Sequence, residues 1–284
     1  MKVGVYYNNR DIRVEERPVP EIGPDEVLLR IKACGICGSD VMEWYRIKKA
    51  PRILGHEACG EIVRVGSGVR DWEVGDRVFV SHHVPCYECR YCRAGHHTLC
   101  ETLRRTNIDP GGFAEFVRVP EINVRFGLFR LPDGISFDLG TFIEPLGCVI
   151  RGQRLVRLRE GELVLILGSG ISGQLHIRLA KARGATVIAT DINDYRKGLA
   201  RSSGADLVVD GRDDVTGAIV RDFGRLPDLA IVATAALPAI EQAFTAVDRG
   251  GRILFFAPTA PEERLPMPLF DLYFNGTEIY FSYA

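Results

Sequence analysis

A glycine-rich segment near the middle of the chain, LVLILGSGISGQ, restricts the possible folds more than any other stretch. Its run of apolar residues predicts a strand that is buried on both faces, as in a parallel sheet. Gly168, Gly170 and Gly173 follow in the pattern G-x-G-x-x-G. The first glycine permits a tight turn, the second lets the backbone approach a pyrophosphate, and the third lets helix and strand pack closely. Because the helix that begins here offers free N–H groups to phosphates, the segment predicts a dinucleotide site.

Strands and helices alternate through the rest of this half of the chain. TVIATD, DLVVD, LAIVAT and RILFFA are typical of buried strands, and amphipathic helices are expected near residues 194–203, 213–223 and 238–250. Near-continuous apolar strands that alternate with helices indicate an α/β fold with a doubly wound parallel sheet.

The first half of the chain has a different pattern. Residues 1 to about 135 carry short β-rich runs such as KVGVYY and DRVFVS, separated by turn residues. This pattern predicts a compact, barrel-like β domain. We therefore expect two domains, with boundaries at 1–145 and 146–284.

The second strand of the α/β half ends at Asp191, 23 residues after Gly168. A carboxylate at this point can accept hydrogen bonds from the adenosine ribose and would repel a 2′-phosphate, which favours NAD over NADP. Arg196 lies nearby in the sequence and keeps NADP as an alternative. For Phe256, two roles fit the sequence equally well: contact with the cofactor, and closing the core at the end of a buried strand. The predicted cofactor-binding residues are Gly168, Gly170, Ile171, Ser172, Gly173, Asp191, Ile192, Arg196, Ala233, Thr234, Phe256 and Ala257.

Composition excludes several classes of partner. The net charge is −1 and charged residues make up 26% of the chain, so no broad field would recruit nucleic acid or an anionic membrane. The N-terminal MKVGVYYNNR lacks the apolar stretch of a signal peptide, and no apolar run approaches membrane-spanning length. We therefore expect a cytoplasmic protein, in which clustered cysteines are metal ligands rather than disulfides.

A loop with the sequence CYECRYCRAGHHTLC contains four cysteines, Cys86, Cys89, Cys92 and Cys100. Four thiolates fill the tetrahedral shell of Zn²⁺ and leave no position for substrate, so they predict a structural zinc site in a lobe spanning residues 82–105. An iron–sulfur cluster is the alternative, because C-x2-C-x2-C also opens the bacterial ferredoxin motif. That motif continues C-x3-C-P, whereas seven residues separate the last two cysteines here, which favours zinc.

A second and open metal site is predicted upstream. CGICGSD contains Cys34 and Cys37, and GHE contains His56 and Glu57. One thiolate, one imidazole and one carboxylate would leave a fourth position open, as catalytic zinc requires. On spacing alone, a redox cysteine pair and a histidine of the core remain alternatives.

Taken in order, GHEACGEIVRVGSGV, VGDRVFV, the four-cysteine loop and the glycine motif resemble the zinc-dependent medium-chain dehydrogenase/reductase family, the alcohol dehydrogenase superfamily. This resemblance implies an N-terminal GroES-like catalytic domain joined to a Rossmann domain that binds NAD. It also implies two zinc ions per chain, one catalytic and one structural.

The same resemblance assigns roles at the open site. Cys37 and His56 match zinc ligands, and Glu57 matches the adjacent acid. Asp40 matches a carboxylate that orients the zinc histidine. Cys34 has no ligand role in the family.

The remaining zinc position falls on Glu144 of FIEPLGCVI, where classical alcohol dehydrogenases have cysteine. This glutamate resembles that of the sorbitol and polyol dehydrogenase branch. Cys148 is interpreted as a residue of helix packing.

The activity implied is hydride transfer from a secondary alcohol, a polyol or sugar alcohol, to NAD, which gives a ketone. Ser39 matches the hydroxyl that accepts the alcohol proton. The histidine that relays this proton in many relatives is replaced by Met42, so ribose hydroxyls, water, Glu43 or Tyr45 are left as routes to solvent.

Two alternatives to this function stay open. One is a dehydrogenase specific for threonine or for simple alcohols. The other is an inactive, zinc-stabilised protein that binds NAD. The resemblance implies a C-terminal return segment that completes the catalytic domain, and the sequence stops at TEIYFSYA, about where that segment is expected to begin. The segment DLYFNGTEIYFSYA matches the region through which relatives form dimers, so a homodimer or homotetramer is expected.

Overall fold

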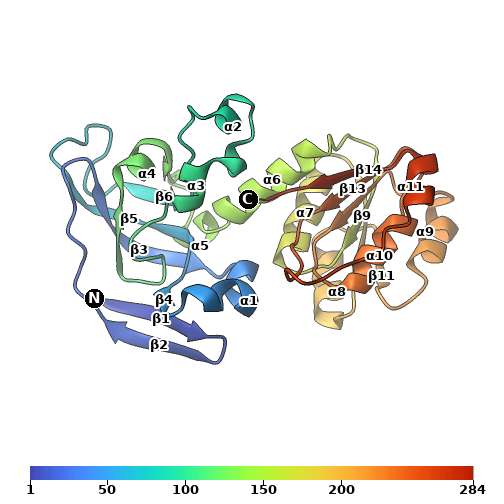
Figure 1. Ribbon diagram of the computed structural model, residues 1–284, viewed down its shortest axis with the longest axis horizontal. Helices are drawn as coiled ribbons and strands as arrows, with labels where there is room; N and C mark the ends of the chain where they lie inside the picture. Colours follow the sequence, from blue (N-terminus) through green and yellow to red (C-terminus); the bar gives the residue numbers. More distant parts are fainter. Residues whose placement is uncertain (284) are drawn as a thin grey trace. The chain divides into compact units, whose positions relative to one another are not determined.

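The computed structural model describes residues 1–283, which form two compact units that meet at Pro145 and Leu146 (Figure 1). We call them the N-terminal unit and the C-terminal unit. Among the described residues, no helix is both long enough and apolar enough to span a membrane.

The N-terminal unit is built on two antiparallel sheets. The larger has the order β7-β3-β5-β6-β8 and the smaller the order β2-β1-β4. The strands are β1 (Lys2–Asn8), β2 (Asp11–Glu16), β3 (Val27–Gly35), β4 (Arg52–Ile53), β5 (Glu57–Val65), β6 (Arg77–Ser81), β7 (Phe116–Val119) and β8 (Leu128–Arg130).

One core holds the two sheets of this unit together. Val5 of β1, Leu29 of β3, Ile62 of β5 and Val117 of β7 are almost completely buried in one cluster. Burial of branched apolar side chains on one face of each strand is what stabilises such a fold. The predicted β-rich domain is therefore confirmed.

Short helical segments connect the strands of the N-terminal unit. They are the 3-10 helices η1 (Gly38–Val41), η2 (Ile47–Lys49) and η3 (His97–Leu99), and the α-helices α1 (Glu43–Arg46), α2 (Arg90–Arg93), α3 (Glu101–Arg105), α4 (Glu121–Phe126) and α5 (Phe137–Gly140). The longer helix α6 (Ile143–Leu155) leads into the C-terminal unit.

A six-stranded parallel sheet forms the centre of the C-terminal unit, with the order β11-β10-β9-β12-β13-β14. Its strands are β9 (Leu163–Leu167), β10 (Thr186–Asp191), β11 (Leu207–Asp210), β12 (Leu229–Val232), β13 (Arg252–Phe255) and β14 (Glu278–Phe281). Its helices are α7 (Ile171–Ala182), α8 (Asp194–Ser202), α9 (Val215–Phe223), α10 (Leu237–Thr245) and α11 (Leu269–Asn275).

Strand β9 is central in the sheet, and its side chains enter two separate cores. Leu165 and Leu167 lie in one buried cluster, whereas Val164 and Ile166 lie in another. Because alternate side chains point to opposite faces of a strand, both faces of the sheet are covered. The predicted doubly wound parallel sheet is confirmed, and its order reverses between β9 and β12, where such folds bind ligands.

The end of the described chain differs from the sequence pattern. From its sequence, the aromatic stretch DLYFNGTEIYF is expected to form a dimer contact or, alternatively, an internal edge strand. The structure divides it into α11, closed by Gly276 at φ 63°, and β14, which is the edge strand of the sheet. Glycine tolerates this left-handed conformation, so it ends the helix and lets the strand begin.

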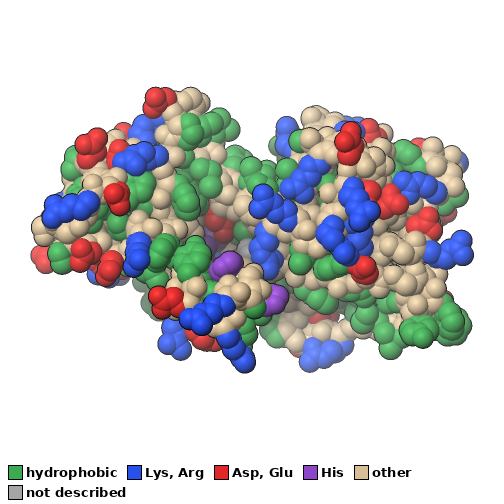
Figure 2. All heavy atoms as spheres, turned by 90° about the horizontal axis from the view of Figure 1, so that it is seen from above, with side chains coloured by type: hydrophobic (Ala, Val, Ile, Leu, Met, Phe, Trp, Pro, Cys, Tyr) green, Lys and Arg blue, Asp and Glu red, His purple; other side chains and the backbone are tan. Residues whose placement is uncertain are grey.

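Both signs of charge are distributed over the surface seen in Figure 2, in each unit. This distribution agrees with the net charge of −1. It provides no one-signed surface for a polyanion on that face.

Candidate active site and metal centres

Local sequence alone places the first candidate ligand. Cys37 precedes η1, and its Sγ accepts a hydrogen bond from the N–H of Ser39 at 3.4 Å. The N–H of Cys37 in turn donates to Oδ2 of Asp40 at 3.1 Å. These reciprocal bonds form a capping box, so the sequence Cys-Gly-Ser-Asp orients the thiol and a buried carboxylate together.

The next two candidates lie at the start of β5. His56 is 9% exposed and Glu57 7% exposed. The Nδ1 atom of His56 is 3.6 Å from Oδ1 of Asp40, which leaves Nε2 for a metal. Gly35 of β3 pairs with Glu57, and a Cβ on Gly35 would lie 2.0 Å from Oε2 of Glu57. The carboxylate of Glu57 therefore occupies the space that is free because Gly35 has no side chain.

Three of the predicted ligands converge as a result. One ligand atom from each of Cys37, His56 and Glu57 lies within 4.8 Å of the others. A thiol, an imidazole and a carboxylate so close together are a donor set that fits Zn²⁺ and leaves a fourth position for substrate.

Burial shifts the pKa of each of these donors toward its neutral form. It raises the pKa of Cys37 to about 11 and lowers the pKa of His56. Burial, with a further contribution from the charge of Asp40, raises the pKa of Glu57 to about 7. A divalent cation would favour the deprotonated thiol and carboxyl groups, so binding of zinc should release protons.

Glu144 lies in the first turn of α6. Its charge contributes, after burial, to the raised pKa of Cys37, which places the carboxylate in the surroundings of the thiol. Cys34 stands outside the three-ligand cluster, and its Sγ donates to the carbonyl of Gly35 at 3.6 Å. This position agrees with a packing role for Cys34.

The surroundings of Ser39 contain a residue that the sequence pattern did not indicate. Oγ of Ser39 accepts a hydrogen bond from Nη2 of Arg46 at 2.7 Å. Glu43 instead accepts from the N–H of Asn9 at 3.2 Å, and the ring of Tyr45 packs on the guanidinium of Arg46. Within residues 1–283, no hydrogen bond joins Ser39 to either predicted relay residue.

Two consecutive histidines after β6 were also not predicted for this site. The ring of His82 lies 4.8 Å from that of His56, and the ring of His83 lies 3.8 Å from that of His82. Among residues 1–283, the buried Nδ1 atoms of His82 and His83 have no hydrogen-bond partner. His82 therefore adds an unsatisfied buried polar group next to the ring of His56.

The four cysteines of the loop form a second cluster. The Sγ atoms of Cys86 and Cys100 are 3.6 Å apart, as are those of Cys89 and Cys92, and all four lie within 4.8 Å of one another. Zn–S bonds of about 2.3 Å in a tetrahedron place the sulfurs roughly 3.8 Å apart. These separations are too long for disulfides and suit one tetrahedral zinc ion.

Electrostatics and packing in this loop agree with a metal site. Burial by itself would raise the pKa of Cys100, but hydrogen bonds from the backbone of Cys86 and Leu103 and from the neighbouring thiols lower it to about 6. Apart from its cysteines, the buried cluster of the lobe contains only Leu103 as a fully buried apolar side chain. Because a core this small does not stabilise the lobe by itself, a bound metal would supply the missing stability.

The glycine turn of the C-terminal unit has the geometry of a phosphate cradle. Gly168 adopts φ 90°, which side chains other than glycine rarely accept. A Cβ on Gly170 would meet no atom within 4 Å, so open space lies where a pyrophosphate would approach. A Cβ on Gly173 would lie 2.0 Å from the carbonyl oxygen of Gly168, so α7 contacts the turn directly. The turn fits a dinucleotide.

Asp191 lies at the carboxyl end of β10 and is 8% exposed. Its Oδ2 accepts from the N–H of Ser169 at 2.9 Å, and its Oδ1 accepts from the N–H of Asn193 at 2.9 Å. Each carboxylate oxygen keeps a further lone pair for a ribose hydroxyl. Arg196 lies 3.9 Å from Oδ2 and is largely exposed.

The other predicted cofactor residues surround the same carboxyl ends. Ile171 and Ile192 are exposed apolar side chains, 47% and 63% accessible, next to the glycine turn and Asp191. Exposed apolar residues at a ligand crevice are available to pack on a base. The partly buried residues of this set are Ser172, Ala233, Thr234, Phe256 and Ala257.

Phe256 has a packing role in addition to its place at a strand end. Its ring meets that of His176 edge to face at 4.5 Å. The ring also lies 3.3 Å from where a Cβ on Gly152 would be. These contacts account for Phe256 as part of the core between α6 and α7.

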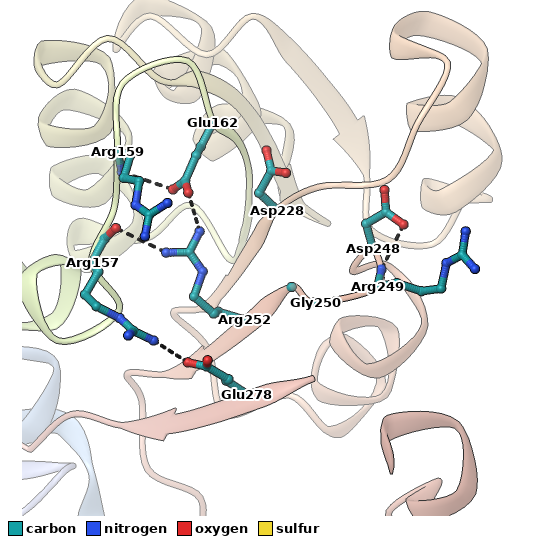
Figure 3. Close-up of a pocket in the computed structure, with 10 residues that line it drawn as sticks. Arg157, Arg159, Glu162, Asp228, Asp248, Arg249, Gly250, Arg252 and Glu278 are labelled. Carbon is teal, nitrogen blue, oxygen red and sulfur yellow. Dashed lines mark hydrogen bonds and ion pairs between the residues drawn. The ribbon is translucent and has the colours of Figure 1, made fainter. Parts of the chain in front are cut away.

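A hollow of about 290 Å³ elsewhere in the C-terminal unit is lined by charged residues (Figure 3). Nη2 of Arg252 pairs with Oε1 of Glu162 at 2.6 Å, and Nη2 of Arg157 pairs with Oε2 of Glu278 at 2.5 Å. Glu162, Arg252 and Glu278 lie at the amino ends of β9, β13 and β14. Ligands of such sheets bind at the carboxyl ends, so this hollow is separate from the cofactor crevice.

Comparisons with known proteins agree with both halves of this description. Residues 23–133 match the alcohol dehydrogenase GroES-like domain, and residues 172–284 match the zinc-binding dehydrogenase model. L-threonine 3-dehydrogenase of Rhizobium etli is 36% identical over 84% of this chain and 71% of its own length. Sorbitol dehydrogenase of Bacillus subtilis is 34% identical over 100% of this chain and 83% of its own length.

A solved structure extends the similarity to three dimensions. It is a protein from Sinorhizobium meliloti described as a zinc-binding dehydrogenase, with NADP bound. It superposes with a TM-score of 0.89 at 32% identity, over 99% of this chain and 84% of that one.

Proposed function

Because this chain belongs to the zinc-dependent medium-chain dehydrogenase family, we propose that it oxidises a secondary alcohol, a polyol or sugar alcohol, to a ketone with NAD. The observation that carries the proposal is the convergence of Cys37, His56 and Glu57 within 4.8 Å. When bound, zinc supplies Lewis-acid chemistry at the substrate oxygen, and the nicotinamide accepts the hydride.

The chain's own residues supply orientation and proton transfer. Oδ1 of Asp40 lies 3.6 Å from Nδ1 of His56, so the imidazole presents its other nitrogen to the metal. Ser39 accepts the proton of the alcohol through its Oγ.

Glu144 supports the choice of a polyol. We place its carboxylate at the remaining zinc position, because its charge acts on Cys37 and because its segment resembles the polyol branch. Threonine and simple alcohols are the alternative substrates, since an L-threonine 3-dehydrogenase is among the relatives.

NAD is the proposed oxidant. The carboxylate of Asp191 lies where the 2′-phosphate of NADP would bind, and the two negative charges would repel each other. The neighbouring Arg196 and the NADP in the Sinorhizobium meliloti structure are the arguments for the other cofactor. Tighter binding of NADPH than of NADH in a titration of nucleotide fluorescence would contradict this part of the proposal.

A substrate screen tests the function itself. Reduction of NAD is followed with sorbitol, other polyols, threonine and simple alcohols, on protein whose zinc content has been measured. We expect two zinc ions per chain and the fastest turnover with a polyol. Two zinc ions and tight NAD binding without turnover on any alcohol would instead indicate an inactive binding protein.

A pair of variants tests the assignment of Glu144. Glu144→Ala should lower turnover, because it removes a carboxylate from the surroundings of Cys37. Cys148→Ala, four residues further along α6, should leave turnover and zinc content unchanged. The reverse result would show that Cys148 is the ligand.

The surface of α11 and β14 supports a further part of the proposal, a homodimer or homotetramer. Phe270, Tyr273 and Phe281 are 73%, 80% and 73% exposed, and β14 is the edge strand of its sheet. Exposed aromatic residues beside an unpaired strand edge are typical of a contact between copies. Sedimentation should give an oligomer for the wild type and a smaller species for Tyr273→Glu. A monomeric wild type would contradict it.

A further inference from the structure

Arg46 connects two groups of the candidate active site through one side chain. Its Nη2 lies 2.7 Å from Oγ of Ser39 and 2.9 Å from Oδ1 of Asp40. Its Nε donates to the backbone carbonyl of Ser39 at 3.0 Å. The side chain of Arg46 is 13% exposed and that of Asp40 is 4% exposed, so these bonds are shielded from water.

The contact determines how Ser39 can use its hydroxyl group. A guanidinium has five donors and no acceptor, so Oγ of Ser39 must be the acceptor of this bond. One of its two lone pairs is then occupied. The other lone pair and the O–H bond remain, and they point in different directions. An alcohol that arrives at the metal site can donate its proton only to the free lone pair.

We propose that Arg46 is a positioning residue that orients Ser39 to accept a proton from the alcohol and to donate its own hydrogen onward. This inference rests on the proposed dehydrogenase function. In the transfer, an O–H bond to Ser39 forms as that of the alcohol breaks, and the original hydrogen of Ser39 passes as a proton to a ribose hydroxyl of the bound cofactor or to water. Arg46 cannot take that proton, because its guanidinium has no lone pair to offer.

Met42 makes such an orientation necessary. It occupies the position where a relay histidine is expected, and a thioether cannot pass a proton on. Without a histidine to draw the hydrogen of Ser39, the hydroxyl group would rotate freely. The bond from Arg46 restricts this rotation, because it occupies one of the directions that the O–H could take, and a bond from a charged donor is about twice as strong as a neutral one.

The simpler reading of Arg46 is that it only neutralises the buried Asp40. Asp40 contacts the N–H of Cys37 and the ring of His56, so that role would act through the metal ligands. The two roles differ in one respect. An effect through Ser39 must disappear when Ser39 has no hydroxyl group, whereas an effect through Asp40 must remain.

A double-mutant cycle separates them. The variants are Arg46→Met, Ser39→Ala and the two combined, each loaded with Co²⁺ in place of zinc and saturated with NAD. The visible spectrum of the cobalt gives the Kd of 2,2,2-trifluoroethanol, an alcohol probe that need not react. Arg52→Met is the matched control, because it removes a neighbouring half-buried positive charge that has no hydrogen bond to Ser39.

We expect Arg46→Met to weaken trifluoroethanol binding roughly 10- to 100-fold, the range for a charge-assisted hydrogen bond. In the Ser39→Ala protein the same substitution should change the Kd less than twofold. Arg46→Lys should recover part of the loss, since a lysine keeps the charge but not the fork of donors. Arg52→Met should leave the Kd within twofold of the wild type.

Turnover supplies a second readout on whichever alcohol the wild type oxidises. Arg46→Met should lower kcat more than it raises KM, and the solvent deuterium isotope effect on kcat should increase. A purely structural role would not produce that pair of changes.

Two results would overturn the proposal. One is an equal loss of affinity from Arg46→Met with and without the Ser39 hydroxyl group. The other is loss of cobalt from the open site in Arg46→Met protein. A wild type that binds trifluoroethanol but oxidises no alcohol would contradict the proposed function alone, because the titration needs no turnover.

Discussion

His176 of α7 is completely buried, and its replacement should change how the stability of the C-terminal unit depends on pH. Its Nδ1 lies 3.3 Å from Nε2 of Gln153, and its Nε2 has no hydrogen-bond partner within residues 1–283. Burial lowers the pKa of His176 from 6.5 to about 3, because the charged ring would lose its hydration without gaining a partner.

The sign of the effect follows from proton uptake. Between pH 3 and 6.5 the unfolded chain binds a proton at His176 and the folded chain does not. Stability is therefore complete above the unfolded pKa and falls as the pH drops below it. At pH 5 the difference from the unfolded pKa is 1.5 units, which corresponds to about 2 kcal/mol at 1.36 kcal/mol per unit.

Native-state hydrogen exchange on peptides from β9 and α7 measures this quantity in the C-terminal unit. Tryptophan fluorescence would not, because Trp44 and Trp72 both belong to the N-terminal unit. Between pH 7.5 and 5.0 the free energy of unfolding should fall by about 2 kcal/mol more in the wild type than in His176→Leu. The packing cost of the leucine is the same at both pH values and cancels.

His96→Gln, which removes an exposed imidazole of the lobe, should behave as the wild type in this experiment. Equal losses of stability in the wild type and His176→Leu would refute the reasoning. That result would mean that the folded unit accommodates a charged His176.

Three further substitutions test the metal and cofactor sites. Gly35→Ala places a Cβ 2.0 Å from Oε2 of Glu57, so the carboxylate must move by more than the roughly 0.2 Å that metal ligation tolerates; elemental analysis should find one zinc per chain instead of two, with the circular dichroism spectrum unchanged. Cys100→Ser should remove the other zinc and open the lobe to limited proteolysis, while a protected lobe would argue against a structural metal. Gly173→Ala brings a Cβ to 2.0 Å from the carbonyl of Gly168, so the turn must shift; NADH should bind at least about tenfold more weakly, and unchanged affinity would argue against the cradle.

Some of these features could be predicted because they are local in the chain. The glycine turn joins one strand directly to one helix, and Asp191 ends the next strand of the same β-α-β unit. The four loop cysteines lie within fifteen residues, so a short chain brings them together in almost any fold. For such features the spacing in the sequence already limits the spacing in space.

One feature followed the sequence pattern only in part. The aromatic stretch at the end of the described chain has the composition of a strand, because aromatic residues favour strands. Its first part, Leu269–Asn275, is nevertheless helical. Propensity is a weak guide where tertiary contacts decide, and Leu272 is buried in the core of the C-terminal unit.

The open metal site lies between these two cases. Cys37 and Asp40 are positioned by a capping box within four residues, which the sequence alone determines. His56 and Glu57 reach them only because β3 pairs with β5 in a register that sets Gly35 opposite Glu57. The ligand types could be named from motifs, whereas their approach to within 4.8 Å is a property of the sheet.

By itself, the sequence predicted the alternation of strands and helices, the glycine turn followed by an acid, and the grouping of the four loop cysteines. The glycine turn and the cysteine group follow from contacts between chain neighbours, whereas the order of the strands in the sheet rests on pairings such as that of β9 with β12, about 65 residues apart. Only the tertiary structure decided that Arg46 donates to Ser39 and that His82 packs beside His56. His56 and His82 are 26 residues apart, on segments joined through the pairing of β5 with β6. Arginine and histidine follow no periodic pattern, and their roles here come from which charged or polar group the folded chain places within hydrogen-bonding distance.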